Sequence, residues 1–478
     1  MKAFAAIVKL TLRDALRSHI FQLLLGLLVV SAIALPTTVS GAGDGMRAYI
    51  QVALKYSLGA VGFILVLSTV WLSSLVMTQD VESYQLHMVV AKPVSRIKIF
   101  LAKYFSVVLL HAILLVLAGI AIYLGVMWRF NQDDPGMDKA KLEQERERIR
   151  NEVLVGRRVY TAEMPDMEKL AKEALEQQLE DIRKSGRTVS GNAADEEKAI
   201  RESMSEDMLR QRAEIMHGKK REWVFRNLPK DLKDPIYLRY RSYVGKIDSE
   251  AQRDTVGEWR IFFVRLKDGV DPNGNIGEDD YIRSWERLGP EMSYAGEFHE
   301  KVFKGTIVDP EGNVSISYTN LDPQKDKVYF QTVDGPKLLI KVTGFAGNFI
   351  RGLLVILLML IVYAGISCAA AAALSMPTTI FVVLSYMFLG GIAPLIMTTT
   401  QLRDASQYAG YWIGKVLEYI MAPLQKFEIS QKIAGGELVE FSFIGELFLW
   451  HFVIQTLPII ALGVYLYWRR ELGLVIRK

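Results

Sequence analysis

The sequence predicts an α-helical polytopic membrane protein with about six transmembrane helices and an inserted α+β soluble domain. Half of the 478 residues are hydrophobic, and the mean hydropathy is +0.17. The apolar residues gather in blocks, several of which reach the roughly 20 residues that a helix needs to cross a hydrocarbon core. Between the third and fourth blocks lies a long polar stretch, which is too large to be an ordinary loop.

Two groups of three apolar blocks flank this polar stretch. We expect an amphipathic helix and spans one to three within residues 1–130, and spans four to six with a tail within residues 348–478. The six predicted spans are residues 20–39, 56–77, 104–127, 353–374, 378–397 and 443–468.

The orientation follows from the distribution of lysine and arginine around the spans. Basic residues are enriched in cytoplasmic flanks, and here they precede span one, follow span two and end the chain. We therefore expect a multi-pass protein of the plasma (inner) membrane, with both termini in the cytoplasm and the insert outside it. Basic residues in the loop before span six weaken this contrast.

The insert changes character near its middle. Residues 131–220 are rich in Glu, Lys, Arg, Ala and Leu, and apolar residues recur there every three or four positions between Met167 and Ile182, which predicts amphipathic helix. Residues 221–347 alternate with a period of two, and turn formers interrupt them, which predicts an antiparallel β-sandwich. The strand candidates are residues 236–244, 258–264, 301–307, 313–318, 328–331 and 337–342.

Several chemistries find no support in the sequence. The segment Gly410–Lys415 is one residue short of a phosphate-binding loop and lacks its Ser or Thr. The turn at residues 271–277 resembles a calcium loop only faintly, and an acidic surface turn is the better interpretation. The net charge of +4 gives no sign of a nucleic-acid partner. We therefore expect no enzyme activity, no metal site and no cofactor in this chain.

Three polar residues fall inside or near the predicted spans. They are His111 in span three, and Glu446 and His451 in span six. Polar groups are costly in lipid and mark functional sites by default. However, a hydrogen bond to a carbonyl of a neighbouring helix explains His111, and a position at the interface explains the other two. We therefore assign none of them as a site.

The link between spans two and three is the most informative segment. It begins with acidic residues that include Glu82, and an amphipathic stretch through Leu86 follows. Pro93 ends that stretch, and Ser95 is placed to N-cap the next helix. The result would be a short helix across the cytoplasmic mouth that can pass a push to two spans. An ordinary interfacial loop explains the residues equally well.

This link resembles a signature of the permease subunits of ABC transporters of the type-2 exporter family. The resemblance rests on an acidic residue followed by apolar positions and a basic Pro-Val-Ser-Arg segment leading into span three. These residues include Glu82, Leu86, Lys92, Pro93, Ser95 and Arg96. Tyr84-Gln85 stand where many members have Gly-Thr.

Features at both ends of the chain agree with this resemblance. A basic amphipathic helix with Arg13 and Arg17 precedes span one, a Gly435-Gly436 pair precedes span six, and the tail is basic and acidic. The resemblance covers roughly residues 1–130 and 348–478, and it says nothing about the insert.

The resemblance implies a permease that pairs with itself or a similar chain, as a homodimer or heterodimer. It implies docking to a separate ABC ATP-binding subunit, which would carry the ATP and magnesium. The region from Glu82 to Arg96, together with the N-terminal interfacial helix, would couple ATPase closure to rearrangement of the spans in the lipid.

Two alternatives stay open from the sequence. In the first, the ATPase-coupled membrane part acts mechanically on an envelope protein through the outer domain, without moving a solute. In the second, the chain is a membrane-anchored binding or scaffold protein. The substrate cannot be deduced from the residues.

Overall fold

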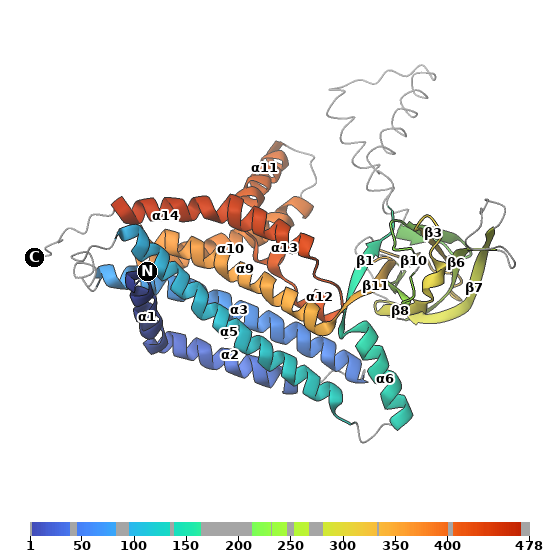
Figure 1. Ribbon diagram of the computed structural model, residues 1–478. Coiled ribbons are helices and arrows are strands. Elements are labelled where there is room, and N and C mark those ends of the chain that lie inside the picture. Colours follow the sequence, from blue (N-terminus) through green and yellow to red (C-terminus); the bar gives the residue numbers. More distant parts are fainter. Residues whose placement is uncertain are drawn as a thin grey trace, which may run out of the picture. The chain divides into compact units, whose positions relative to one another are not determined.

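The computed structural model describes residues 2–38, 45–82, 95–133, 138–163, 213–230, 232–245, 253–266, 281–331, 334–399 and 405–469. The chain forms two compact units (Figure 1), one made of Met1–Gly156 with Thr343–Lys478 and the other of Arg157–Val342. The first is helical and the second is built of strands. The helix α6, which falls in the predicted insert, belongs to the helical unit.

Long apolar helices dominate the helical unit. Four segments are long and apolar enough to cross a membrane: Gly45–Gln79, Arg96–Asn131, Phe345–Ala371 and Phe441–Arg469. They correspond to α3 (Gly45–Glu82), α5 (Arg96–Asn131), α9 (Phe345–Ala371) and the run of α13 (Phe441–Leu447), η4 (Phe448–Thr456) and α14 (Leu457–Arg469). The η4 segment is a π-helix.

Two more helices occupy the remaining predicted spans. The helix α2 (His19–Thr38) follows α1 (Lys2–Arg17) after a 75° bend, so the two together count as one broken span or a re-entrant segment. The helix α10 (Met376–Thr399) contains a shorter apolar stretch, Met376–Ile392. Four described helices are therefore candidate membrane spans by their length and composition, and a count of six remains a prediction.

The helix α3 lies at the centre of the helical unit. It packs against α2, α5, α9 and α10, as Figure 1 shows for its immediate neighbours. Elsewhere in this unit small residues allow α14 and α9 to approach closely: a Cβ at Gly463 of α14 would meet the backbone of Ala369 in α9 at 2.5 Å. Such contacts are typical of helix association in membranes, where no hydrophobic effect draws helices together.

Shorter helices lie at the predicted outer end and before the last span. They are α6 (Lys139–Glu152), α11 (Ala405–Ile420), the 3₁₀ turn η3 (Leu424–Phe427) and α12 (Ser430–Ala434). The sequence placed only a loop between the fifth and sixth spans, so α11 and α12 were missed. At 16 and five residues, both are too short to register as spans.

The second unit contains antiparallel strands in three sheets. One sheet has the order β1 (Val155–Thr161), β11 (Lys337–Gly344), β4 (Ile236–Arg241) and β8 (Phe298–Phe303). Another has the order β3 (Lys220–Phe225), β9 (Val314–Asn320), β6 (Asp254–Leu266) and β7 (Tyr281–Tyr294). A small sheet joins β2 (Glu214–Ile215), β10 (Val328–Tyr329) and β5 (Tyr243–Val244).

One core fills the space between the two four-stranded sheets. It joins Leu238 and Ile340 of one sheet with Trp259 and Ile316 of the other. The prediction of a separate antiparallel β region is therefore confirmed. Residues 164–212, where the amphipathic repeat was found, lie outside the described residues.

The strand predictions differ from the structure at several places. Residues 155–161 were predicted to be helical, which was wrong because they pair in a sheet as β1. The predicted strand at 301–307 ends at Phe303, and the 3₁₀ turn η2 (Gly305–Ile307) follows it. The whole of β7 was missed, because its charged residues and the pair Gly289-Pro290 break the alternating pattern.

Candidate functional site

The start of α5 is built as the sequence predicted. Ser95 N-caps this helix, and its side-chain oxygen accepts a hydrogen bond from the backbone nitrogen of Lys98 at 3.4 Å. A serine at this position satisfies one of the amide groups that the first turn leaves without a helical partner. The prediction of this N-cap is confirmed.

The same end of the helical unit is braced between three helices. Arg96, in the first turn of α5, donates a hydrogen bond to the carbonyl of Trp468 in the last turn of α14 at 2.9 Å. Lys103, almost two turns further along α5, is buried and donates to the carbonyl of Val76 in α3 at 2.6 Å. A lysine ammonium held this way carries a charge-assisted hydrogen bond, so α3, α5 and α14 are tied together at this end.

The other residues predicted to couple to a partner are only partly described. Glu82 is the last residue of α3, and nothing is described of its side chain. Leu86, Lys92 and Pro93 lie outside the described residues. The structure therefore places Ser95 and Arg96 at the start of α5, and the coupling role of all six residues stays a prediction.

The N-terminal helix lies against the first half of α5. Phe4 of α1 contacts Phe105 of α5, with their ring centroids 6.0 Å apart. Thr11 and Ala15 are buried on the packed face, while Arg13 and Arg17 are exposed. The exposed arginines thus belong to a helix that contacts the braced end through α5.

The structure places the three polar residues that the sequence singled out in or near the spans. Nδ1 of His111 lies 2.9 Å from the Val107 carbonyl, and its Nε2 lies 3.1 Å from the Ser68 hydroxyl of α3. His451 is buried, with Nδ1 2.7 Å from Oε1 of Gln455. Glu446 is exposed on α13. His111 therefore contacts a hydroxyl of the neighbouring helix rather than the carbonyl that was predicted, and His451 is buried rather than exposed at the interface.

A second cluster, which the sequence did not reveal, lies where the chain passes between the two units. Asn348, near the start of α9, is fully buried. Its side-chain nitrogen donates to the carbonyl of Glu437 at 2.8 Å, and its side-chain oxygen accepts from the backbone nitrogen of Val439 at 2.8 Å. The Asn348 side chain thus pairs with one carbonyl and one amide of the segment that leads into α13, as the backbone of a neighbouring strand would.

The exit from α6 reaches the same cluster. A Cβ at Gly156 would lie 3.1 Å from Cβ of Asn348. Glu152 forms an ion pair with Arg47 in the first turn of α3 at 3.0 Å. Gly436 has a φ of +66°, and a Cβ there would lie 2.2 Å from the Glu152 carbonyl oxygen. We call Arg47, Glu152, Gly156, Asn348 and the segment 436–439 the outer junction.

The outer junction joins three parts of the helical unit near the two points where the chain leaves this unit, after Gly156, and returns to it, at Thr343. We call these two points the crossings. The outer junction contains the end of α6, the first residues of β1 and the start of α9 after β11, together with the start of α3 and the segment before α13. The Gly435-Gly436 pair was the only feature of the outer junction that the sequence analysis singled out. Its second glycine has a physical reason, because a side chain at Gly436 meets both backbone strain and the α6 carbonyl.

The described residues offer little sign of metal or nucleotide chemistry. Within the described ranges, no group of three or more His, Cys, Asp or Glu side chains is arranged to hold a metal ion. The segment Gly410–Lys415 lies inside the helix α11. The predicted acidic turn at 271–277 lies outside the described residues.

Comparison with known proteins gives no assignment. No family model matches the chain. No curated protein and no solved structure matches it either. The function is therefore argued from the residues and their geometry.

Proposed function

We propose that this chain is the membrane-spanning permease subunit of an ATP-driven ABC exporter, which docks to a separate ATPase subunit. In this proposal the braced end faces the cytoplasm and receives the push of the ATPase through the link between α3 and α5. The permease pairs with a second copy or a similar chain, and the spans number six.

The observation that carries this proposal is the bracing of three helices beside the link. A force on a loose loop would only bend the loop. Here the Arg96–Trp468 and Lys103–Val76 hydrogen bonds connect α5 to α14 and to α3, so a displacement of the link moves these helices together. Coupling of this kind needs two packings that differ by a few kcal/mol, so that the nucleotide state can select between them.

The test uses the full chain reconstituted with an ATP-binding cassette ATPase that copurifies with it from its native membrane. The variant Arg96→Glu combined with Glu82→Lys is expected to reach the membrane in normal amount and to reduce the stimulation of the ATPase several-fold. The control is Lys139→Glu, an exposed residue at the start of α6 and far along the chain from the link. Unchanged stimulation in the double variant would refute the coupling assignment.

The outer junction favours a second candidate, in which the helices act mechanically on an envelope partner through the strand unit. Both crossings into the strand unit are held to α3 and to the segment before α13 by Glu152 and Asn348. Movement of those helices would therefore pull on the crossings. The test is the hydrogen-exchange rate of residues 436–441 in ATP-bound and ADP-bound complexes. A rate that differs between the two states would support this candidate, and the same rate in both would count against it.

A scaffold without moving parts is the remaining alternative. It predicts that the chain copurifies with no ATPase at all. The same reconstitution separates it from the two ATPase-coupled candidates.

A further inference from the structure

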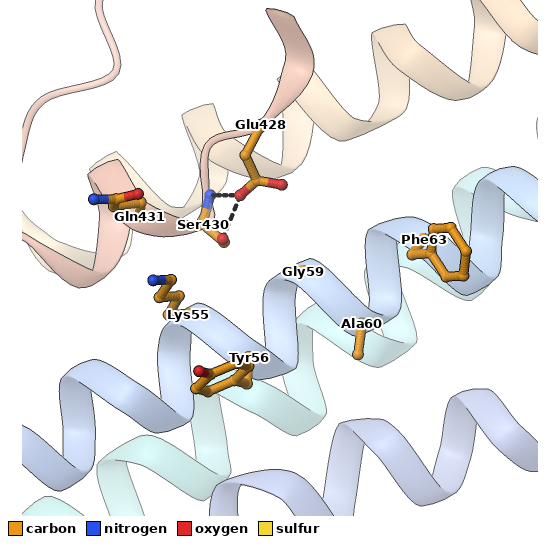
Figure 2. Close-up of a pocket in the computed structure, with 8 residues that line it drawn as sticks. All are labelled: Lys55, Tyr56, Gly59, Ala60, Phe63, Glu428, Ser430 and Gln431. Atoms are coloured by element: carbon orange, nitrogen blue, oxygen red, sulfur yellow. Dashed lines mark hydrogen bonds between the residues drawn. The ribbon is translucent and has the colours of Figure 1, made fainter. Parts of the chain in front are cut away.

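An open groove runs along one side of the helical unit, between α3 and the segment that contains α12. Its volume is about 780 Å³. Figure 2 shows the residues that line it: Lys55, Tyr56, Gly59, Ala60 and Phe63 from α3, and Glu428, Ser430 and Gln431 from the opposite wall.

The α3 wall is polar at one end and apolar at the other. Lys55 and Tyr56 stand at the outer end, where the apolar part of this helix begins. Phe63 is eight positions further on, which corresponds to about 12 Å along the helix axis. Gly59, between them, has no side chain, so the backbone forms the floor of the groove. The rings of Tyr56 and Phe63 are both more than half exposed, at 56% and 54%.

The groove holds two opposite charges that do not pair with each other. The Lys55 ammonium lies over the Tyr56 ring, 5.9 Å from its centroid. Oε1 of Glu428 accepts hydrogen bonds from the backbone nitrogen of Ser430, at 2.9 Å, and from its hydroxyl. In the part of the chain that the structure describes, neither Lys55 nor Glu428 takes part in a salt bridge. Each wall therefore presents a charge to whatever enters.

The depth of the groove fits a lipid. Tyrosine and lysine side chains favour the headgroup level of a bilayer, whereas Phe63 lies within the apolar part of the spanning segment Gly45–Gln79. A molecule in this groove would place a polar head at Lys55 and an acyl chain along Gly59, Ala60 and Phe63.

We propose that the groove binds a membrane phospholipid whose headgroup carries both a phosphate and a free amine, of the phosphatidylethanolamine class. The phosphate accepts from the Lys55 ammonium, and the lipid ammonium donates to Oε2 of Glu428, both as charge-assisted hydrogen bonds. A headgroup with only negative charge would meet the Glu428 carboxylate as well as Lys55, and is therefore disfavoured. The inference requires only that α3 crosses the membrane, and not that the chain couples to an ATPase.

The test counts lipids bound to the purified full chain by native mass spectrometry, with phosphatidylethanolamine or phosphatidylglycerol added to the micelles. The wild type is expected to prefer phosphatidylethanolamine. Lys55→Ala should weaken binding about tenfold, the loss of one hydrogen bond to a charged group. Glu428→Gln should reverse the preference toward phosphatidylglycerol, because the carboxylate that repels it is gone. Lys415→Ala on α11, a lysine that also lies over an aromatic ring, should bind as the wild type does.

A filling variant tests the acyl part without altering the charges. A Cβ at Gly59 would have only the Ser430 hydroxyl within 4 Å, at 3.7 Å, so Gly59→Ala is expected to fold and Gly59→Leu to exclude the lipid chain. Three results would overturn the proposal: a wild-type preference for phosphatidylglycerol, equal binding by all variants, or equal loss in Lys55→Ala and Lys415→Ala. The proposal would also be overturned if a second copy of the chain occupied the groove. The mass spectra would then show a dimer that binds the same number of lipids in the wild type and in Lys55→Ala.

Discussion

The outer junction can be tested by removing one side chain, Asn348. The substitution Asn348→Ala deletes both hydrogen bonds to the segment before α13 and leaves the helix α9 otherwise intact, because alanine favours helix. The Glu437 carbonyl and the Val439 amide then lose the partners that lie 2.8 Å away in the wild type.

The expected cost follows from the burial of these two backbone groups. Val439 is buried and Glu437 half-buried, and a buried polar group without a partner costs about 1–3 kcal/mol. Water reaches the half-buried carbonyl more easily than the amide. A total of about 2 kcal/mol is therefore reasonable, which corresponds to about a thirtyfold increase in the local opening equilibrium.

Hydrogen exchange followed by mass spectrometry measures this opening in the full chain. Peptides that contain the Val439 amide should exchange about thirtyfold faster in Asn348→Ala, whereas peptides from α5 should exchange as in the wild type. The control is Asn131→Ala, which removes an exposed asparagine at the end of α5. Wild-type exchange at Val439 in the Asn348 variant would refute the junction as described, since the amide would then be protected by something else.

The remaining predictions concern one glycine and one carboxylate. Gly436→Ala should destabilise the full chain by about 1–2 kcal/mol for its left-handed backbone alone, and by more for the contact with Glu152, and should lower the thermal midpoint accordingly. Gly445→Ala, where a Cβ would meet nothing within 4 Å, should leave the midpoint unchanged; equal midpoints for the two variants would contradict this prediction. In the strand unit, the hydrogen bonds from Arg253 hold the pKa of Asp322 below its ordinary value. A carboxylate with a depressed pKa stabilises the fold above its unfolded pKa of about 4, and this stabilisation is lost as the pH falls through the folded pKa. Asp322→Asn should therefore destabilise the full chain at pH 7, and the difference from the wild type should shrink below about pH 4; a difference independent of pH would be evidence against it.

Local features of the fold could be predicted because local physics decides them. The apolar blocks gave the positions of the long helices, since the hydrocarbon core sets their length. Ser95 after Pro93 gave the start of α5, since the cap is a contact within one turn. In the strand unit, the alternation around residues 258–264 and 313–318 gave β6 and β9, since one face of each is buried.

Features decided by distant residues could not be predicted. The strand β1 follows directly on a charged helix, and only its pairing with β11 from the far end of the insert makes it a strand. Asn348 and Glu437 are 89 positions apart, and Lys55 and Glu428 lie in different thirds of the chain. For Asn348 and Lys55, the neighbouring residues in the sequence show no periodicity or motif that would identify the distant partner.

The helix α3 connects the outer junction to the link between α3 and α5. Its first turn carries Arg47 of the outer junction, and its last residues precede the link that we propose receives the ATPase. Its 38 residues correspond to roughly 57 Å of helix. Because α3 packs against α2, α5, α9, α10 and α12, we expect a displacement at one end to be passed along the helix rather than lost in local bending. We therefore expect the two ends of α3 to be coupled rather than to function independently. The hydrogen exchange of residues 436–441 is the most direct measure of whether a push at the link reaches the outer junction.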